Sequence, residues 1–273
     1  HPSGLYLKDS QQAFLISEAV RGEKAHLLNK AGKRFMVPIH ELAELAPRDI
    51  VARSIFKQML KDEMPYVRLS LKHLDKEMIL KRFPGIHAKC KEFGYDLTQE
   101  IPVAPAAHYS VGGVLSNADG RTDIKRLYVC GEVSATGIMG ANRLASNSLI
   151  ECLVFANRAV EDTVKVGIVT DFPVFEAEFT RDEANADMYV AVRSKVSEIM
   201  NYHAGIVRNE SSLLEGLAKI DEVRKDVDAV SAPGVKEFYA EACRRLLRVA
   251  RLIMEPALMR KESRGGHYRE DYP

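Results

Sequence analysis

The sequence of 273 residues has no tryptophan, almost no net charge and no long apolar run, and these absences exclude several classes of protein. Lysine and arginine together number 39, against 38 aspartates and glutamates. The formal net charge of +1 therefore provides no general attraction for nucleic acids or membranes. No apolar run reaches the roughly 18 residues that a membrane-spanning helix needs, and no signal peptide opens the chain. We expect a cytoplasmic protein without a nucleic-acid or membrane partner.

Two kinds of motif for metals or cofactors are also missing. The four cysteines lie far apart, without the C-x-x-C spacing that is typical of zinc and iron–sulfur sites: Cys90, Cys130, Cys152 and Cys243. We expect reduced, mostly buried thiols and no metal site in this chain. A G-x-G-x-x-G turn, which binds the diphosphate of a dinucleotide between a strand and a helix, does not occur either.

The most informative stretch that is present covers residues 140–149, which read GANRLASNSL. A helix is predicted to begin near the end of this stretch, because apolar residues recur there at helical spacing: Leu149, Ile150, Leu153, Val154 and Ala156. Ser146, Asn147 and Ser148 are candidate N-caps, and the free N–H groups of the first turn favour an anion in front of the helix. Such a start is by itself more typical of a simple cap than of a ligand site.

Two segments before this helix favour a binding crevice. Residues 127–130 form an apolar run that predicts a strand, which ends in Gly131-Glu132 and is followed by a glycine-spaced loop. A strand, a glycine turn and a helix N-terminus are together typical of the phosphate or cofactor crevice of an α/β sheet. Further upstream, His108 precedes the glycine pair at residues 112–113, where the backbone can approach a ligand closely.

Residues 1–105 predict a mixture of short strands and helices. A turn at residues 30–33 between two apolar strands predicts a hairpin. Pro47 introduces a helix whose apolar face is formed by Ile50, Val51, Ile55, Met59 and Leu60. The pair Pro84-Gly85 predicts a break in another helical stretch, and residues 101–105 read as an extended linker.

The C-terminal part of the sequence is strongly helical. Three apolar stripes predict three amphipathic helices, and their members are Val192, Val196, Ile199 and Met200; Leu213, Leu214, Leu217, Ile220, Val223 and Val227; and Phe238, Tyr239, Cys243, Leu246, Leu247, Ala250 and Ile253. Short links between the helices favour an antiparallel three-helix bundle. Such stripes are far more typical of a core than of a cofactor site.

Three segments carry a resemblance to a known family. They read PAAHYSVGGV (residues 105–114), GRTDIKRLYVCGE (120–132) and GANRLASNSLIECLVFA (140–156). They resemble the L-aspartate oxidases, a branch of the succinate dehydrogenase and fumarate reductase flavoproteins, and the resemblance extends over nearly the whole chain. Two positions favour this branch. Pro47 stands before Arg48-Asp49 where the dehydrogenases and reductases usually have serine, and Ala145 stands where they tend to have glycine.

The resemblance implies an α+β fold made of three parts. Residues 1–105 would be a portion of a capping domain that closes over the flavin, residues 106–170 a return segment of the FAD-binding α/β domain, and residues 171–273 the C-terminal three-helix bundle. Because the family's G-x-G-x-x-G motif is missing and the chain starts at His1, it resembles the C-terminal half of a longer flavoenzyme. We expect FAD as the cofactor of that whole enzyme and no FAD in this chain alone.

The resemblance also implies a dicarboxylate site. Arginine matches a carboxylate with two parallel hydrogen bonds. By family analogy Arg48 is the catalytic residue, a proton donor or acceptor in the direction of fumarate reduction. The substrate-binding residues implied by the motifs are His108 and Arg143 at one carboxylate and His1 and Ser17 at the other, together with Glu18. From the residues alone, the unfavourable position of a cation at a helix start favours a functional role for Arg48, and an ion pair with Asp49 or Glu44 is the alternative.

The same analogy implies contacts with FAD. Glu132 would accept hydrogen bonds from the ribityl hydroxyls, and the backbone N–H groups of Ser148 and Leu149 would face the flavin ring. Met139 stands where many relatives have histidine, so any contact of that histidine is in doubt here. For His267, in the segment SRGGHYR, a structural and a catalytic role both stay open.

The reaction implied by the resemblance is oxidation of L-aspartate to iminoaspartate, with oxygen or fumarate as the electron acceptor. Fumarate-like dicarboxylates are further expected ligands, and quinolinate synthase would use the product in NAD biosynthesis. Two alternatives stay open: a succinate dehydrogenase or fumarate reductase subunit with an iron–sulfur partner, and, for the isolated chain, a non-catalytic helical interaction module. Because strands in residues 106–170 would have exposed edges, we also expect the isolated chain to self-associate.

Overall fold

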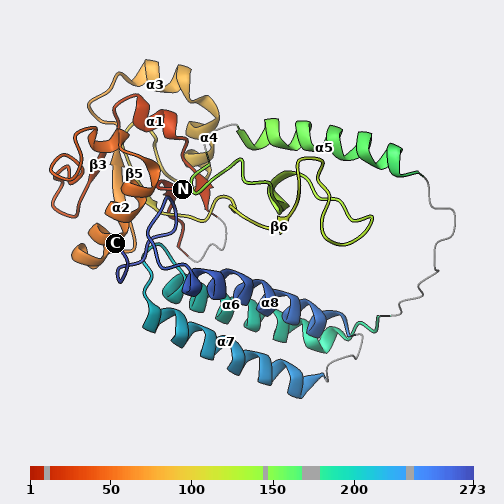
Figure 1. Cartoon of the computed structure of the whole chain (residues 1–273). Helices are drawn as coiled ribbons and strands as arrows, with labels where there is room; N and C mark the ends of the chain where they lie inside the picture. Colours follow the sequence, from red (N-terminus) through yellow and green to blue (C-terminus); the bar gives the residue numbers. More distant parts are fainter. Residues whose placement is uncertain (9–12, 144–146, 168–178, 232–236) are drawn as a thin grey trace. The chain divides into compact units, whose positions relative to one another are not determined.

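The computed structural model describes residues 1–8, 13–143, 147–167, 179–231 and 237–273, and the chain forms two compact units, His1–Tyr109 and Ser110–Pro273 (Figure 1). The candidate N-cap Ser146 and the family position Ala145 lie outside the described residues. In the described part of the chain no helix is long and apolar enough to cross a membrane.

A small antiparallel sheet forms the centre of the first unit, in the order β2-β1-β5-β4-β3. Its strands are β1 Gly4–Leu5, β2 Phe14–Leu15, β3 His26–Leu28, β4 Val67–Ser70 and β5 Glu100–Ala104. Leu27, Leu69 and Ile101 lie opposite one another on three adjacent strands, and all three are fully buried. This row is the centre of the apolar core, because cross-strand side chains on one face of a sheet pack together.

The sheet shows that the linker predicted for residues 101–105 is wrong, since β5 lies between β1 and β4. The prediction failed because Pro102 lacks the N–H that a central strand normally donates. In the structure the carbonyl of Pro102 accepts a hydrogen bond from the N–H of Tyr6 (3.0 Å), just after the two-residue strand β1 ends. The proline therefore removes only one hydrogen bond here, the one that an N–H at residue 102 would donate back to Tyr6.

Helical segments surround this sheet: α1 Glu18–Gly22, the 3-10 turn η1 Ala43–Leu45, α2 Arg48–Asp62, α3 Lys76–Arg82 and α4 Pro84–Glu92. Helix α2 begins after Pro47, as predicted, and the break predicted at Pro84-Gly85 falls just before Pro84, between α3 and α4. Val51 and Ile55 of α2 are buried in the core, whereas Leu60, expected on the same face, is 65% exposed. Leu60 lies about two and a half turns beyond Val51, so the two side chains point in opposite directions.

The hairpin predicted around residues 30–33 exists only as a turn. The N–H of Asn29 donates to the carbonyl of Lys33 over 3.0 Å, and Gly32 takes a positive φ of 79°. Beyond the turn a single bridge joins Leu28 to Arg34, so residues 33–37 contain no second strand. Strand β3 pairs with β4 instead.

The second unit begins with loops, two short parallel strands and a long helix. These elements are β6 Val114–Leu115, the 3-10 turn η2 Gly131–Val133, β7 Ser134–Ala135 and α5 Asn147–Val166. The strand predicted for residues 127–130 is wrong, because this segment makes only one isolated bridge, between Tyr128 and Arg121. An apolar run needs a neighbouring strand to join a sheet, and the described residues provide none beside it.

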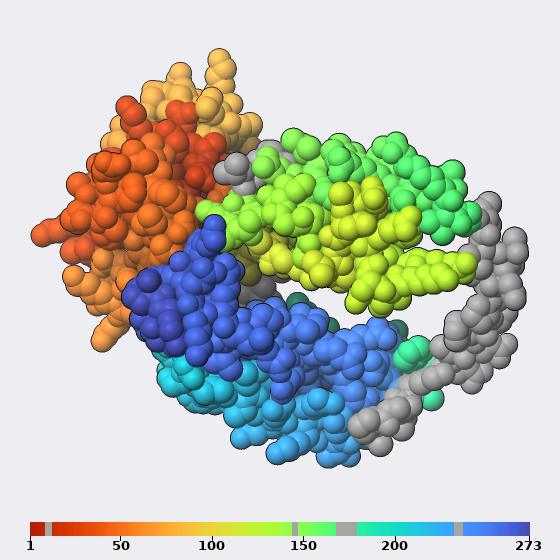
Figure 2. Space-filling view, in the orientation of Figure 1, coloured from red at the N-terminus to blue at the C-terminus, as the bar shows by residue number. Residues whose placement is uncertain are grey.

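Helix α5 forms as its periodicity predicts, but most apolar residues of the predicted stripe are exposed, whereas Phe155 and Ala159 are buried. Leu149, Leu153 and Val164 are 70%, 74% and 75% exposed, and the helix (green) lies at the surface in the space-filling view (Figure 2). The opposite side of the helix buries the carboxylates of Glu151 and Asp162. The candidate caps Asn147 and Ser148 lie inside the helix rather than before it.

Three long helices complete the second unit: α6 Ala186–His203, α7 Glu210–Val230 and α8 Phe238–Met259, with the 3-10 turn η3 Glu183–Asn185 before them. The three helices lie side by side (Figure 1), and they share one apolar core, to which α6 contributes Val196, α7 Ile220 and α8 Leu247. Some members of the predicted stripes are exposed instead, at 50%, 47% and 45%: Leu214, Phe238 and Ile253. Cys90 and Cys243 are buried, as expected, whereas Cys130 is exposed.

Candidate active site

In the first unit, Arg48 in the first turn of α2 forms an ion pair with Glu18 at the start of α1 (Nη2 to Oε2, 2.8 Å). The partners suggested by the sequence, Asp49 and Glu44, pair with other arginines. The guanidinium carbon of Arg48 lies 6.0 Å from the centre of the Tyr109 ring. A helix N-terminus disfavours a cation, so the carboxylate of Glu18 compensates for the position of Arg48.

A second arginine, Arg21, lies beside Glu18 and was missed by the sequence analysis. Its side chain is fully buried, with Nη2 3.6 Å from Oε1 of Glu18 and Nη1 donating to the carbonyl of Glu44 (2.6 Å). Its Nε and Nη2 make no hydrogen bond within the described residues, and burial lowers the pKa of Arg21. The spacing of three residues between Glu18 and Arg21 is the signal that could have found it. Glu18 thus contacts two guanidinium groups.

Two of the histidines of the first unit, His1 and His108, contact each other edge to face, with ring centres 5.5 Å apart and planes at 88°. His108 also contacts Tyr109 at 5.3 Å, which connects both histidines to Arg48. Ser17 caps α1, since its hydroxyl accepts a hydrogen bond from a backbone N–H of that helix (3.2 Å). The site residues predicted in this unit therefore lie along one continuous set of contacts.

In the second unit, Arg143 and Glu132 line a pocket of ≈ 170 Å³. Nη1 of Arg143 lies 3.0 Å from Oε2 of Glu132, and Oε1 of Glu132 accepts a hydrogen bond from the N–H of Ser110 (3.0 Å). The side chain of Arg143 is only 11% exposed, whereas that of Glu132 is 49% exposed. Met139 and Gly140 also line the pocket. It therefore offers a cation and a carboxylate next to accessible glycine backbone.

The two predicted flavin-binding residues of α5, Ser148 and Leu149, are not among the residues that line this pocket. Ser148 and Leu149 lie in the first turn of α5, where N–H groups have no acceptor within the helix. Gly113 packs so closely on η2 that a Cβ there would lie 2.1 Å from the carbonyl oxygen of Val133, which explains why this position is a glycine.

His267, whose role the sequence left open, contacts residues other than those of the pocket. Its Nδ1 lies 3.1 Å from Nη1 of Arg208, and its Nε2 lies 3.1 Å from the carbonyl oxygen of Arg260. Burial lowers the pKa of His267, so the neutral imidazole is favoured.

Comparisons with known proteins identify the family. The chain matches the FAD binding domain family over residues 1–149 and the fumarate reductase flavoprotein C-terminal family over residues 193–273. It is 42% identical to the chloroplastic L-aspartate oxidase of rice (Oryza sativa subsp. japonica), over 96% of this chain and 44% of that protein. It is also 42% identical to the L-aspartate oxidase of Streptomyces coelicolor, over 100% of this chain and 49% of that protein.

Solved structures agree with these matches. A quinol-fumarate reductase with menaquinol molecules is 28% identical and has a TM-score of 0.82, over 99% of this chain and 53% of that one. The chain spans about half the length of the curated relatives it matches. The expected α+β class is confirmed at this level, as helices with a small antiparallel sheet. The chain therefore belongs to the FAD-binding flavoprotein family of the succinate dehydrogenases and fumarate reductases, and within it resembles the L-aspartate oxidases.

Proposed function

We propose that this chain is part of an FAD-dependent L-aspartate oxidase, which converts L-aspartate to iminoaspartate in NAD biosynthesis with oxygen or fumarate as the electron acceptor. The observation that carries the proposal is an identity of 42% to the Streptomyces coelicolor enzyme of that name along the whole chain. Quinolinate synthase is then the proposed consumer of the product.

Positive groups in each unit support a dicarboxylate as the substrate. In the first unit, Arg48 and Arg21 place two guanidinium groups beside the single carboxylate of Glu18. In the second unit, the planar fork of Arg143 suits a carboxylate, which it can bind through two parallel hydrogen bonds. We propose that Arg143 and His108 bind one carboxylate of the substrate, and that His1 and Ser17, with Glu18, bind the other.

Oxidising L-aspartate removes a hydride from its α-carbon and a proton from its amino group. When bound, FAD supplies the two-electron acceptor for this chemistry. In our proposal Arg48 orients the substrate and stabilises its charge, and Glu18 holds the guanidinium in place through the 2.8 Å ion pair. With fumarate as the ligand, the same guanidinium would be placed to hold and deliver a proton.

The residues present fit one part of FAD. The half-exposed carboxylate of Glu132 suits the ribityl hydroxyls, which are donors, and the N–H groups of Ser148 and Leu149 suit the electron-rich edge of the flavin ring. The described residues contain no glycine-rich turn between a strand and a helix that would hold the diphosphate. We therefore propose that the isolated chain binds no FAD and is inactive.

The three-part division of the chain is proposed on the same basis. Residues 1–105 would be part of the capping domain, residues 106–170 the return segment of the FAD-binding domain, and residues 171–273 a domain in which α6, α7 and α8 form a three-helix bundle. A cytoplasmic location stays a prediction, because relatives from rice and Arabidopsis thaliana are named chloroplastic.

The test of the function uses the full-length protein, loaded with FAD and mixed with L-aspartate in the absence of oxygen. We expect the yellow flavin absorbance to bleach with L-aspartate and to persist with succinate. Bleaching by succinate alone, together with an iron–sulfur partner in the purified complex, would assign the protein to the dehydrogenase branch instead.

A further inference from the structure

Residues 264–267, which we call the C-terminal turn, contact the loop that carries Arg143. The N–H of Gly266 donates to the carbonyl oxygen of Ala141 (3.3 Å). Gly265 has a φ of +58°, and a Cβ at this position would lie 2.1 Å from the oxygen and 2.6 Å from the carbon of the same carbonyl. Only glycine permits this approach, so the turn and the peptide of Ala141 meet backbone to backbone. Ala141 stands two residues before Arg143.

The C-terminal turn is closed on itself and held by His267. The N–H of Arg264 donates to the carbonyl of His267 (2.8 Å), and the N–H of His267 donates back to the carbonyl of Arg264 (3.1 Å). A guanidinium can only donate, so Nδ1 of His267 accepts from Arg208 while its Nε2 carries the proton and donates to the carbonyl of Arg260. Arg208 also binds the end of α6, since its Nε donates to the carbonyls of the C-cap residue Ala204 (3.2 Å) and of Gly205 (3.0 Å).

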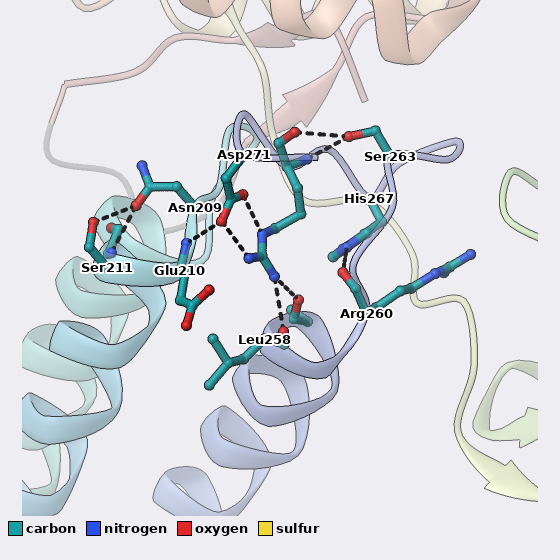
Figure 3. A network of polar contacts seen from close by, with 11 residues as sticks. Asn209, Glu210, Ser211, Leu258, Arg260, Ser263, His267 and Asp271 are labelled. Carbon is teal, nitrogen blue, oxygen red and sulfur yellow. Dashed lines mark hydrogen bonds and ion pairs between the residues drawn. The ribbon is translucent and has the colours of Figure 1, made fainter. Parts of the chain in front are cut away.

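The chain after the turn is fixed to the ends of α7 and α8. Fully buried Arg269 donates to the carbonyls of Ala257 and Leu258 near the end of α8 (3.0 Å each) and pairs with Asp271. Asp271 in turn accepts from the N–H of Glu210 at the start of α7 (2.9 Å), as Figure 3 shows. The C-terminal turn and the residues after it are therefore joined to the ends of all three long helices, through Arg208 and the buried Arg269.

We propose that the C-terminal turn positions Arg143 for binding a substrate carboxylate, with Gly265 and His267 as positioning residues. The inference rests on the proposed function, which gives Arg143 its role. The contact at Ala141 ties a glycine-rich loop to the rigid helices, so that the guanidinium of Arg143 is held where it pairs with Glu132. A carboxylate-binding arginine depends on such positioning, because a misplacement of about 1 Å can lower the rate of a catalysed reaction about 100-fold.

The first test measures binding of malonate, a dicarboxylate, to the full-length, FAD-loaded protein by the change in flavin absorbance. We expect Gly265→Ala to raise the dissociation constant for malonate by at least about tenfold, with the FAD content unchanged. Two control variants should bind malonate as the wild type does. Gly266→Ala adds a methyl group that meets no atom within 4 Å, and Gly94→Ala imposes the same kind of strain, at a φ of +79°, in open space on the first unit. An unchanged constant in Gly265→Ala, or an equal loss in the controls, overturns the proposal.

A double-variant cycle separates positioning from general damage. If Gly265 acts through Arg143, Gly265→Ala should cost no further malonate affinity in an Arg143→Leu background, and a full additive loss there contradicts the inference. A second variant, His267→Leu, removes the hydrogen bonds to Arg208 and Arg260 and should also raise the dissociation constant for malonate. It tests the proposal if Gly265→Ala does not fold. Failure of the proposed function is read separately, from the lack of L-aspartate oxidation by the wild type.

Discussion

Replacing Arg143 by leucine tests the substrate clamp most directly. The side chain of Arg143 is 11% exposed, and it pairs with the carboxylate of Glu132, which is 49% exposed. Truncating one partner of a buried, hydrogen-bonded charge pair costs about 2–5 kcal/mol. Because the site is open to water at Glu132, we take the lower end for the proposed pair of Arg143 with a substrate carboxylate, about 2 kcal/mol, which corresponds to about 30-fold in affinity. We therefore expect the KM of the full-length protein for L-aspartate to rise about 30-fold.

The assay follows oxidation of L-aspartate at several substrate concentrations and compares the bound FAD of each variant. Arg143→Lys keeps the charge but loses the planar fork, so its KM should lie between those of the wild type and Arg143→Leu. The matched control is Arg158→Leu, at an exposed arginine on α5 that donates a long hydrogen bond of 3.4 Å to the carbonyl of Ala118. Its KM should stay within about twofold of the wild-type value. Equal KM values for Arg143→Leu and the wild type would refute a substrate role for Arg143.

Three further predictions concern stability and assembly. Leu69→Ala, in the buried centre of the sheet, should lower the free energy of unfolding in urea by about 2–5 kcal/mol, and a loss no larger than that of Leu80→Ala, at a 40% exposed position, would contradict the core described above. Hydrogen bonds from Arg121 and Tyr128 lower the pKa of Asp162 to about 2, from about 3.9 in an unfolded chain. The thermal midpoint of the wild type should then exceed that of Asp162→Asn by a constant amount above about pH 5, and the difference should shrink as the pH falls toward 2. A difference that grows on acidification would contradict a lowered pKa of Asp162 in the folded chain. Finally, the isolated chain should self-associate through the exposed apolar residues of α5, so Leu153→Lys should reduce its sedimentation coefficient, while Tyr202→Lys, at an exposed position of α6, should not.

Local signals account for the helices that the sequence predicted correctly. Helix α2 begins after Pro47 and α4 at Pro84 because proline suits the first turn of a helix and lacks the donor that a helix interior needs. Helices α5 to α8 follow from apolar residues that recur at helical spacing, a pattern carried entirely by neighbours in the sequence. The same periodicity could not predict that Leu149 and Leu153 of α5 are exposed, because exposure depends on what packs against a helix.

The candidate site was also only partly predictable from the sequence. The family motifs by themselves identify Arg48, Glu18 and Arg143 as candidate site residues. The sequence does not predict the partner of Arg48. The neighbouring Asp49 is the obvious choice, whereas in the structure Arg48 pairs with Glu18, 30 residues away. Arg21 was overlooked because only folding buries it beside that carboxylate.

By itself the sequence determined the family and most helix positions, because motifs and periodicity are properties of neighbouring residues. Only the tertiary structure decided that residues 100–104 form a central strand, since the partners of β5 lie in β1 and β4, far away along the chain. It also decided that Gly265 presses on Ala141, next to the loop of Arg143. Such contacts join segments that are distant in sequence, and they are set by the packing of the whole unit rather than by any local preference of the residues involved.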